Sequence, residues 1–220
     1  MGQRKTLNKE QSKFLRAVSK EKEIIRNFYL SGGTALVAYY IPYRISQDLD
    51  FFSEEEFNSG AIITFLKKYK KEIRYKEFDF QKSFNRNLYF LHIGKKILKV
   101  EFTYYPFPQL KKPRIIEGIK IDSVLDIAVN KLFTISQSPR TRDFMDLYFI
   151  IKKEGFDFFD ILKKARIKFD WHIDAINLGT QLMKVKELKD YPKLLKRVND
   201  KEWQKFYLDI AKKLGKKIFD

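Results

Sequence analysis

Two aspartates, Asp48 and Asp50, lie two residues apart in a segment whose other residues favour a β-strand over 48–52. Side chains alternate across a strand, so the two carboxylates would project from the same face. Carboxylates are ligands for hard divalent cations, and a pair of such cations can clamp a phosphoryl group for in-line displacement. A solvated strand edge or turn has the same spacing, so the pair by itself leaves metal binding open.

A third carboxylate, Glu101, lies in a β-rich run over 96–104. If this strand neighbours the strand of Asp48 and Asp50, the Glu101 carboxylate would lie within reach of the same cations. Glu101 would strengthen the case for a metal site with Asp48 and Asp50, although a solvated strand edge or turn stays an alternative at this point.

A glycine pair precedes the aspartates. The short apolar run 28–30 stops at Gly32-Gly33, and a helical pattern then begins at Thr34 and continues until Pro42. A strand that ends in glycines and leads directly into a helix exposes backbone N–H groups at a positive helix end, which suits triphosphate oxygens. An ordinary tight turn would look the same. However, the order of glycine turn, Arg44 with Ser46, and aspartate pair favours a nucleotide site.

Lys131 falls on the apolar side of a helix predicted over 122–135, because it lies four residues after Ile127 and seven after Val124. A lysine on such a face costs free energy unless an anion meets it. It could reach nucleotide phosphates, pair with an acid, or extend its stem to solvent.

Two further acids, Asp143 and Asp146, share one face of a helix predicted over 141–153. Arg142 and Asp146 also have the spacing of a weak surface ion pair. Spacing alone does not decide between a chemical and a structural role for these acids.

The remaining pattern predicts an α+β half followed by an α-helical half. We expect two domains, at 1–120 and 121–220, with the second domain contributing Lys131 and the acids near 143–146 to the site. The other expected elements are amphipathic helices over 7–26 and 55–71, strands over 73–80 and 87–93, a proline-containing linker over 106–113, and three or four helices over 157–217.

The composition of the chain limits which partners and which chemistry are possible. The 220 residues carry 45 Lys and Arg against 28 Asp and Glu, a net charge of +17 that favours a polyanionic partner, although a lysine-rich surface alone would give the same total. The chain has no cysteine, which excludes a disulfide scaffold, a thiol nucleophile and a cysteine-ligated metal site. No apolar run approaches the roughly 18 residues of a membrane span, and the N-terminus lacks the apolar region of a signal peptide, so we expect a cytoplasmic protein without a membrane partner.

Three segments occur in a fixed order: Leu30-Ser31-Gly32-Gly33-Thr34-Ala35-Leu36, Arg44-Ile45-Ser46-Gln47-Asp48-Leu49-Asp50-Phe51-Phe52 and Arg142-Asp143-Phe144-Met145-Asp146-Leu147-Tyr148. Together they resemble the AbiEii/AbiGii-type nucleotidyltransferase family, the toxin components of bacterial type IV toxin-antitoxin and abortive-infection systems. The resemblance spans about residues 10 to 155.

The resemblance implies a DNA polymerase β-like nucleotidyltransferase core with a mixed sheet, followed by a C-terminal helical region. It implies that the Gly32-Gly33 turn holds NTP phosphates and that Asp48 and Asp50 bind Mg²⁺ or Mn²⁺. Glu101 matches the third carboxylate, a position at which many family members carry aspartate. Lys131 matches the functional lysine of the family, and the carboxylates of its C-terminal acidic motif match Asp143 and Asp146.

We therefore expect an enzyme that transfers a nucleoside monophosphate from an NTP to an acceptor hydroxyl and releases pyrophosphate. Arg44 and Lys131 would stabilise phosphate charge. The basic surface and the family resemblance favour the 3′ end of tRNA as acceptor, with another RNA or a protein hydroxyl as alternatives, and an antitoxin as a protein partner.

Two hypotheses from other classes remain. A non-catalytic nucleic-acid-binding or regulatory module would keep the basic surface and need no metal. A metal-dependent ribonuclease could use the same carboxylates, but it would shorten RNA instead of extending it.

Overall fold

Two units, Met1–Ser123 and Val124–Asp220, make up the chain in the computed structural model, which describes residues 6–170, 172 and 174–219. The first unit contains a seven-stranded sheet, and the second is helical. Among the described residues, no helix is both long and apolar enough to cross a membrane.

The sheet of the first unit is mixed, with strand order β3-β4-β5-β2-β1-β7-β6. Strand β1 pairs antiparallel with β2 and parallel with β7, while β2 pairs parallel with β5. The expected α+β fold with a mixed sheet is therefore confirmed. The strands are β1 (Tyr29–Ser31), β2 (Leu49–Ser53), β3 (Phe78–Ser83), β4 (Arg86–Ile93), β5 (Lys96–Tyr104), β6 (Arg114–Ile116) and β7 (Ile119–Ile121).

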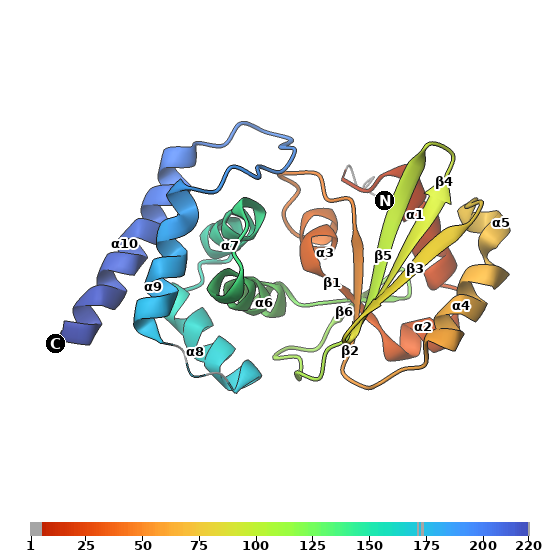
Figure 1. Ribbon diagram of the computed structural model, residues 1–220, viewed down its shortest axis with the longest axis horizontal. Coiled ribbons are helices and arrows are strands. Elements are labelled where there is room, and N and C mark those ends of the chain that lie inside the picture. The colour runs from red at the N-terminus through yellow and green to blue at the C-terminus, as the bar shows by residue number, and fades with distance from the viewer. Residues whose placement is uncertain (1–5, 171, 173, 220) are drawn as a thin grey trace. The chain divides into compact units, whose positions relative to one another are not determined.

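One face of this sheet is apolar because of the alternation along β2 and β5. Phe51 and Phe102 are buried and stack with their ring centroids 5.1 Å apart. The ring centroid of Phe14 in α1 (Lys9–Val18) lies 6.1 Å from that of Phe51. Figure 1 shows α1, α4 (Ser59–Lys68) and α5 (Lys70–Ile73) on one side of the sheet and α3 (Gly32–Tyr39) on the other. Asp50 and Glu101, which are paired in register, project from the opposite face.

Several element boundaries differ from the sequence-based expectation. The helix expected over 7–26 is two helices, α1 and α2 (Lys22–Asn27), and the helix expected over 55–71 is likewise divided into α4 and α5. The strand expected over 73–80 begins only at Phe78. Strands β6 and β7 follow the predicted linker and were not predicted, because three-residue strands depend on pairing with a distant neighbour more than on their own pattern.

The second unit contains α6 (Val124–Gln137), α7 (Thr141–Glu154), α8 (Phe158–Phe169), α9 (Ala175–Met183), the 3-10 helix η1 (Lys184–Lys186) and α10 (Asp200–Phe219). Its core includes the buried Tyr207, whose hydroxyl donates a 2.7 Å hydrogen bond to the carbonyl of Phe144. This bond fixes α10 to α7, and α9 packs along α10 (Figure 1).

A buried ion pair also joins two helices of this unit. The Lys168 ammonium of α8 lies 2.8 Å from the Asp126 carboxylate of α6, and both side chains are fully buried. Breaking such a pair by removing one partner leaves a charge in a poorly solvating environment.

We expect Lys168→Met to lower the free energy of unfolding by about 3–5 kcal/mol, because Asp126 loses its counter-ion. The matched control is Lys163→Met, which removes an exposed lysine from the same helix. Urea denaturation of both variants measures the difference. Equal stability of the two variants would contradict the prediction.

Candidate active site

The glycine turn between β1 and α3 is the point on which most of the predicted residues of the first unit converge. Gly32 has φ +69°, a left-handed conformation, and a Cβ at this position would overlap the Asp50 carboxylate. A Cβ on Gly33 would lie 2.5 Å from Nη2 of Arg44 and 3.0 Å from Oγ of Ser46. The two glycines therefore let three functional side chains approach the backbone at the start of α3.

The two aspartates lie on either side of the first residue of β2. Asp48 lies one residue before the strand, and Asp50 is in register with Ser31 of β1 and with Glu101 of β5. The Thr34 hydroxyl donates a hydrogen bond to the Asp48 carbonyl, which ties this segment to α3. The Asp48 side chain is 34% exposed and its Oδ2 lies 3.4 Å from Nζ of Lys99. Both carboxylates thus lie at the strand end beside the glycine turn.

A buried glutamine that sequence analysis did not identify fixes the loop ahead of Asp48. Gln11 of α1 donates from Nε2 to the carbonyls of Ser46 and Gln47, each at 3.0 Å. The Arg44 guanidinium is almost entirely buried and donates from Nη1 to the Ile45 carbonyl at 3.0 Å. No motif marks Gln11, because its role depends on a loop 35 residues away in the chain.

A second pair missed from the sequence supports the other side of the turn. Ser31, the residue before Gly32, donates from Oγ to Oδ2 of the buried Asp122 at 2.6 Å. Asp122 also accepts from Nε2 of Gln109 at 2.8 Å. In the sequence Asp122 marks only the beginning of a predicted helix, so its link to the turn is visible only in the folded sheet.

Glu101 lies on β5 beside Asp50, as predicted, but its carboxylate is held by an arginine. Oε1 and Oε2 accept 2.6 Å hydrogen bonds from Nε and Nη2 of Arg86, and Oε1 also accepts from the Thr103 hydroxyl at 2.7 Å. Burial alone would raise the pKa of Glu101, but the bonds from Arg86 and Thr103 outweigh it and hold the pKa below its ordinary value.

In the part of the chain that the structure describes, no three His, Asp or Glu side chains are grouped so as to hold a metal ion.

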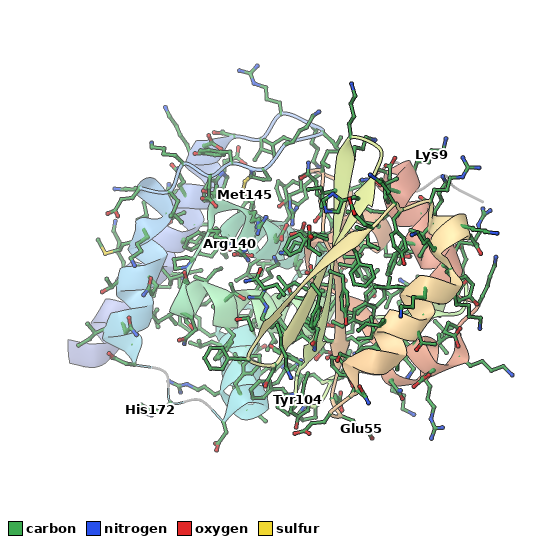
Figure 2. The ribbon with its side chains drawn as sticks, turned by 45° about the vertical axis from the view of Figure 1, so that its right-hand side comes forward. Lys9, Glu55, Tyr104, Arg140, Met145 and His172 are labelled. Atoms are coloured by element: carbon green, nitrogen blue, oxygen red, sulfur yellow. The ribbon has the colours of Figure 1, made fainter. Side chains whose placement is uncertain are left out.

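The predicted residues of the second unit form a buried ion cluster of their own. Nζ of Lys131 lies 2.7 Å from Oδ1 of Asp143 and 2.8 Å from Oδ2 of Asp146, and Nε of Arg140 lies 2.8 Å from Oδ2 of Asp143. Figure 2 labels Arg140, which lies immediately before α7. Of the three alternatives for Lys131, the structure shows pairing with acids. Because Asp146 is buried against Lys131, its carboxylate does not lie at the surface, as the alternative of a surface pair with Arg142 would require.

The ion cluster sets the protonation of Asp143. Burial would raise the pKa of this carboxyl, but the charge of Lys131, followed by that of Arg140, holds the pKa below its ordinary value. A depressed folded-state pKa stabilises the protein above the ordinary aspartate pKa, and the stabilisation disappears as pH falls through the folded-state value.

We expect Asp143→Asn to be less stable than the native chain at neutral pH, with the difference shrinking below about pH 4. Free energies of unfolding from urea titrations between pH 7 and pH 2 measure it. Asp209→Asn, at an exposed position of α10, is the control, and its stability at neutral pH should stay close to that of the native chain. A stability difference for Asp143→Asn that is constant over the whole pH range would contradict the prediction.

The glycine turn gives a second prediction. Gly32→Ala should be more destabilising than Gly94→Ala, although both glycines have positive φ, because only the Cβ at Gly32 meets a neighbouring group. Left-handed strain alone costs about 1–2 kcal/mol at either position. Urea unfolding midpoints compare the two variants, and equal shifts would show that Asp50 does not need the space.

The family of the nucleotidyl transferase AbiEii toxin of type IV toxin-antitoxin systems matches residues 13–220. An uncharacterized protein of Aquifex aeolicus strain VF5 is 35% identical over 169 residues, which cover 74% of this chain and 76% of that protein.

Solved structures share the fold. A candidate nucleotidyltransferase from Helicobacter pylori aligns with a TM-score of 0.62 and 21% identity over 96% of this chain and 97% of its own. The JHP933 protein of Helicobacter pylori aligns with a TM-score of 0.58 and 21% identity over 94% and 90% of the two chains. The family match extends over nearly the whole sequence, including the glycine turn and the paired aspartates. The chain is thus a nucleotidyltransferase that belongs to the AbiEii toxin family of type IV toxin-antitoxin systems.

Proposed function

We propose that this enzyme transfers a nucleoside monophosphate from an NTP to the 3′ hydroxyl of tRNA in a reaction that requires Mg²⁺. The observation that carries the proposal is the convergence of Asp50, Arg44 and Ser46 on the Gly32-Gly33 turn. Phosphate-binding groups and metal-binding groups are needed at one place for phosphoryl transfer, and this turn brings both types together.

The turn and Arg44 would hold the phosphates. Backbone N–H groups at the beginning of α3 have no partner within the helix and lie at its positive end, a typical anion-binding arrangement. The Arg44 guanidinium lies against Gly33 and is held by the Ile45 carbonyl, so its charge is oriented before a nucleotide binds. Ser46 and Thr34 complete the set, with Thr34 fixing the backbone of Asp48.

Asp48 and Asp50 would hold the metal. Both are hard oxygen donors suited to Mg²⁺ or Mn²⁺, and the missing side chain of Gly32 leaves room for the Asp50 carboxylate beside the phosphate-binding turn. A divalent cation bound there would neutralise charge on the transferred phosphoryl group and its leaving pyrophosphate. The partial exposure of Asp48 gives a cation access from solvent.

Lys131 would act on phosphate charge from the helical domain at 121–220, which would thereby add to the site on the domain at 1–120. Support comes from the buried cluster, because the ion pairs with Asp143 and Asp146 hold the Lys131 ammonium in one position. We assign Asp143 and Asp146 the role of positioning residues for this lysine.

RNA is the proposed acceptor because the protein carries a net charge of +17, which lowers the free energy of binding to a polyanion. The family supports an antitoxin as protein partner. Since tRNA is the proposed target, we place the activity in the cytoplasm, where blocked 3′ ends would prevent aminoacylation.

We expect Asp48→Asn/Asp50→Asn to reduce nucleotidyl transfer by at least about 100-fold, because the metal ligands are lost while the shape is kept. The purified protein is incubated with Mg²⁺, total tRNA and each α-labelled NTP in turn, and the products are separated on a denaturing gel. Asp79→Asn, an exposed carboxylate on β3, is the matched control.

Each outcome of this assay decides between hypotheses. Label on tRNA that requires both aspartates and disappears with EDTA supports the proposal, and the labelled NTP identifies the donor. Label on protein contradicts tRNA as acceptor, and shortened tRNA supports a ribonuclease. Tight tRNA binding without label from any NTP supports a non-catalytic module.

A further inference from the structure

The ion pair between Arg86 and Glu101 uses nearly all of the hydrogen-bonding capacity of the Glu101 carboxylate. Two N–H groups of Arg86 and the hydroxyl of Thr103 occupy three acceptor positions at 2.6–2.7 Å. The Glu101 side chain is 6% exposed, so little of it faces solvent or a dissolved cation. A carboxylate whose charge is already matched by a bidentate guanidinium is a poor additional ligand for a metal ion.

The opposite edge of the Arg86 guanidinium is available. The Arg86 side chain is 51% exposed, and within the described residues its bonds to Glu101 involve only Nε and Nη2. The N–H groups of Nη1 therefore point away from Glu101. Because the bond to Glu101 fixes the plane of the guanidinium, binding a ligand there would cost little additional side-chain entropy.

Arg86 also lies close to the proposed metal site. Its partner across the strands is Thr103, two residues beyond Glu101 on β5, and Glu101 is in register with Asp50. Residues paired in register carry their side chains on the same side of a sheet, so Arg86, Glu101 and Asp50 share one face. The bond to Glu101 raises the pKa of Arg86, and the nearby charge of Asp50 raises it further.

We propose that Arg86 is a phosphate-binding residue of the acceptor RNA site, and that Glu101 positions Arg86 instead of binding the metal. A fixed guanidinium whose other three N–H donors, two on Nη1 and one on Nη2, are not used by Glu101 matches the geometry of a phosphate group. The inference rests on the proposed function, since it assigns part of the substrate to the same site.

The neighbouring hairpin turn favours the acceptor over the NTP as the source of this phosphate. Phe84, two residues before Arg86, is 96% exposed at the tip between β3 and β4. Exposed aromatic rings next to arginines are typical of surfaces that stack unpaired bases and hold the adjoining backbone. An RNA strand entering the site along this hairpin would meet Phe84 and Arg86 in succession.

Binding without metal tests the proposal directly. The dissociation constants of a short single-stranded oligoribonucleotide and of inorganic triphosphate are measured in EDTA for the full chain. We expect Arg86→Ala to weaken binding of the oligonucleotide about tenfold or more, with Arg86→Lys retaining part of the affinity. Lys95→Ala removes one exposed positive charge from the turn that follows β4 and serves as the matched control, with a much smaller expected loss of affinity.

The two ligands distinguish the source of the phosphate. Weaker oligonucleotide binding with unchanged triphosphate binding supports the proposal as stated. Weaker triphosphate binding alone would overturn the assignment to the acceptor and place the NTP phosphates at Arg86. Unchanged binding of both ligands, or equal losses in Arg86→Ala and Lys95→Ala, would overturn the phosphate-binding role itself.

Glu101→Gln separates positioning from metal binding. We expect this variant to weaken oligonucleotide binding in EDTA, because the charge-assisted anchor of Arg86 is lost, and to leave unchanged the Mg²⁺ concentration that gives half-maximal transfer. A raised Mg²⁺ requirement with normal oligonucleotide binding would show that Glu101 is a metal ligand. Unfolding midpoints show whether each variant folds. If a variant does not fold, the oligonucleotide affinity of Arg86→Lys is compared with that of the native chain instead.

Failure of this inference is distinguishable from failure of the proposed function. If the native chain transfers no nucleotide to any RNA, the proposed function is wrong whatever Arg86 does. If the native chain labels tRNA and Arg86→Ala binds the oligonucleotide and uses tRNA at the native KM, only the inference is wrong.

Discussion

The close approach of side chains to the backbone at Gly32 and Gly33 is the constraint on which the candidate site depends. Any side chain at Gly32 would occupy the position of the Asp50 carboxylate, and any side chain at Gly33 would meet the Arg44 guanidinium. The positive φ of Gly32 also turns the chain from β1 directly into α3. The groups that we propose to bind phosphate and metal can therefore share one location because this turn has no side chains.

The mixed sheet converts distant sequence segments into neighbours of that turn. Antiparallel pairing of β1 with β2 brings Asp50 beside Ser31, and parallel pairing of β2 with β5 adds Glu101 in the same row. The phenylalanine layer on the opposite face holds this register, since a shift by one residue would bury the carboxylates and expose the rings. The packing of the core thus determines which polar groups meet at the site.

The sequence was informative where local pattern and chemistry coincide, and uninformative where a role depends on a distant partner. The turn, β2 and β5 were predicted because apolar alternation and glycines are local signals. For Lys131 the sequence left phosphates, an acid and solvent as alternatives, because helical spacing places the lysine on the apolar face without identifying its partner. Gln11 and Arg86 escaped prediction because the groups they bind become neighbours only after the sheet and its covering helix assemble.

The ion cluster of the second unit constrains how this sequence can change over evolution. Lys131 and Arg140 carry two positive charges, and Asp143 and Asp146 carry two negative charges, in a region where the lysine and both acids are buried. Loss of Lys131, Asp143 or Asp146 leaves a charge imbalance among buried groups, which the surroundings solvate poorly. A neutral substitution at Lys131, Asp143 or Asp146 therefore needs a compensating change at one of its partners.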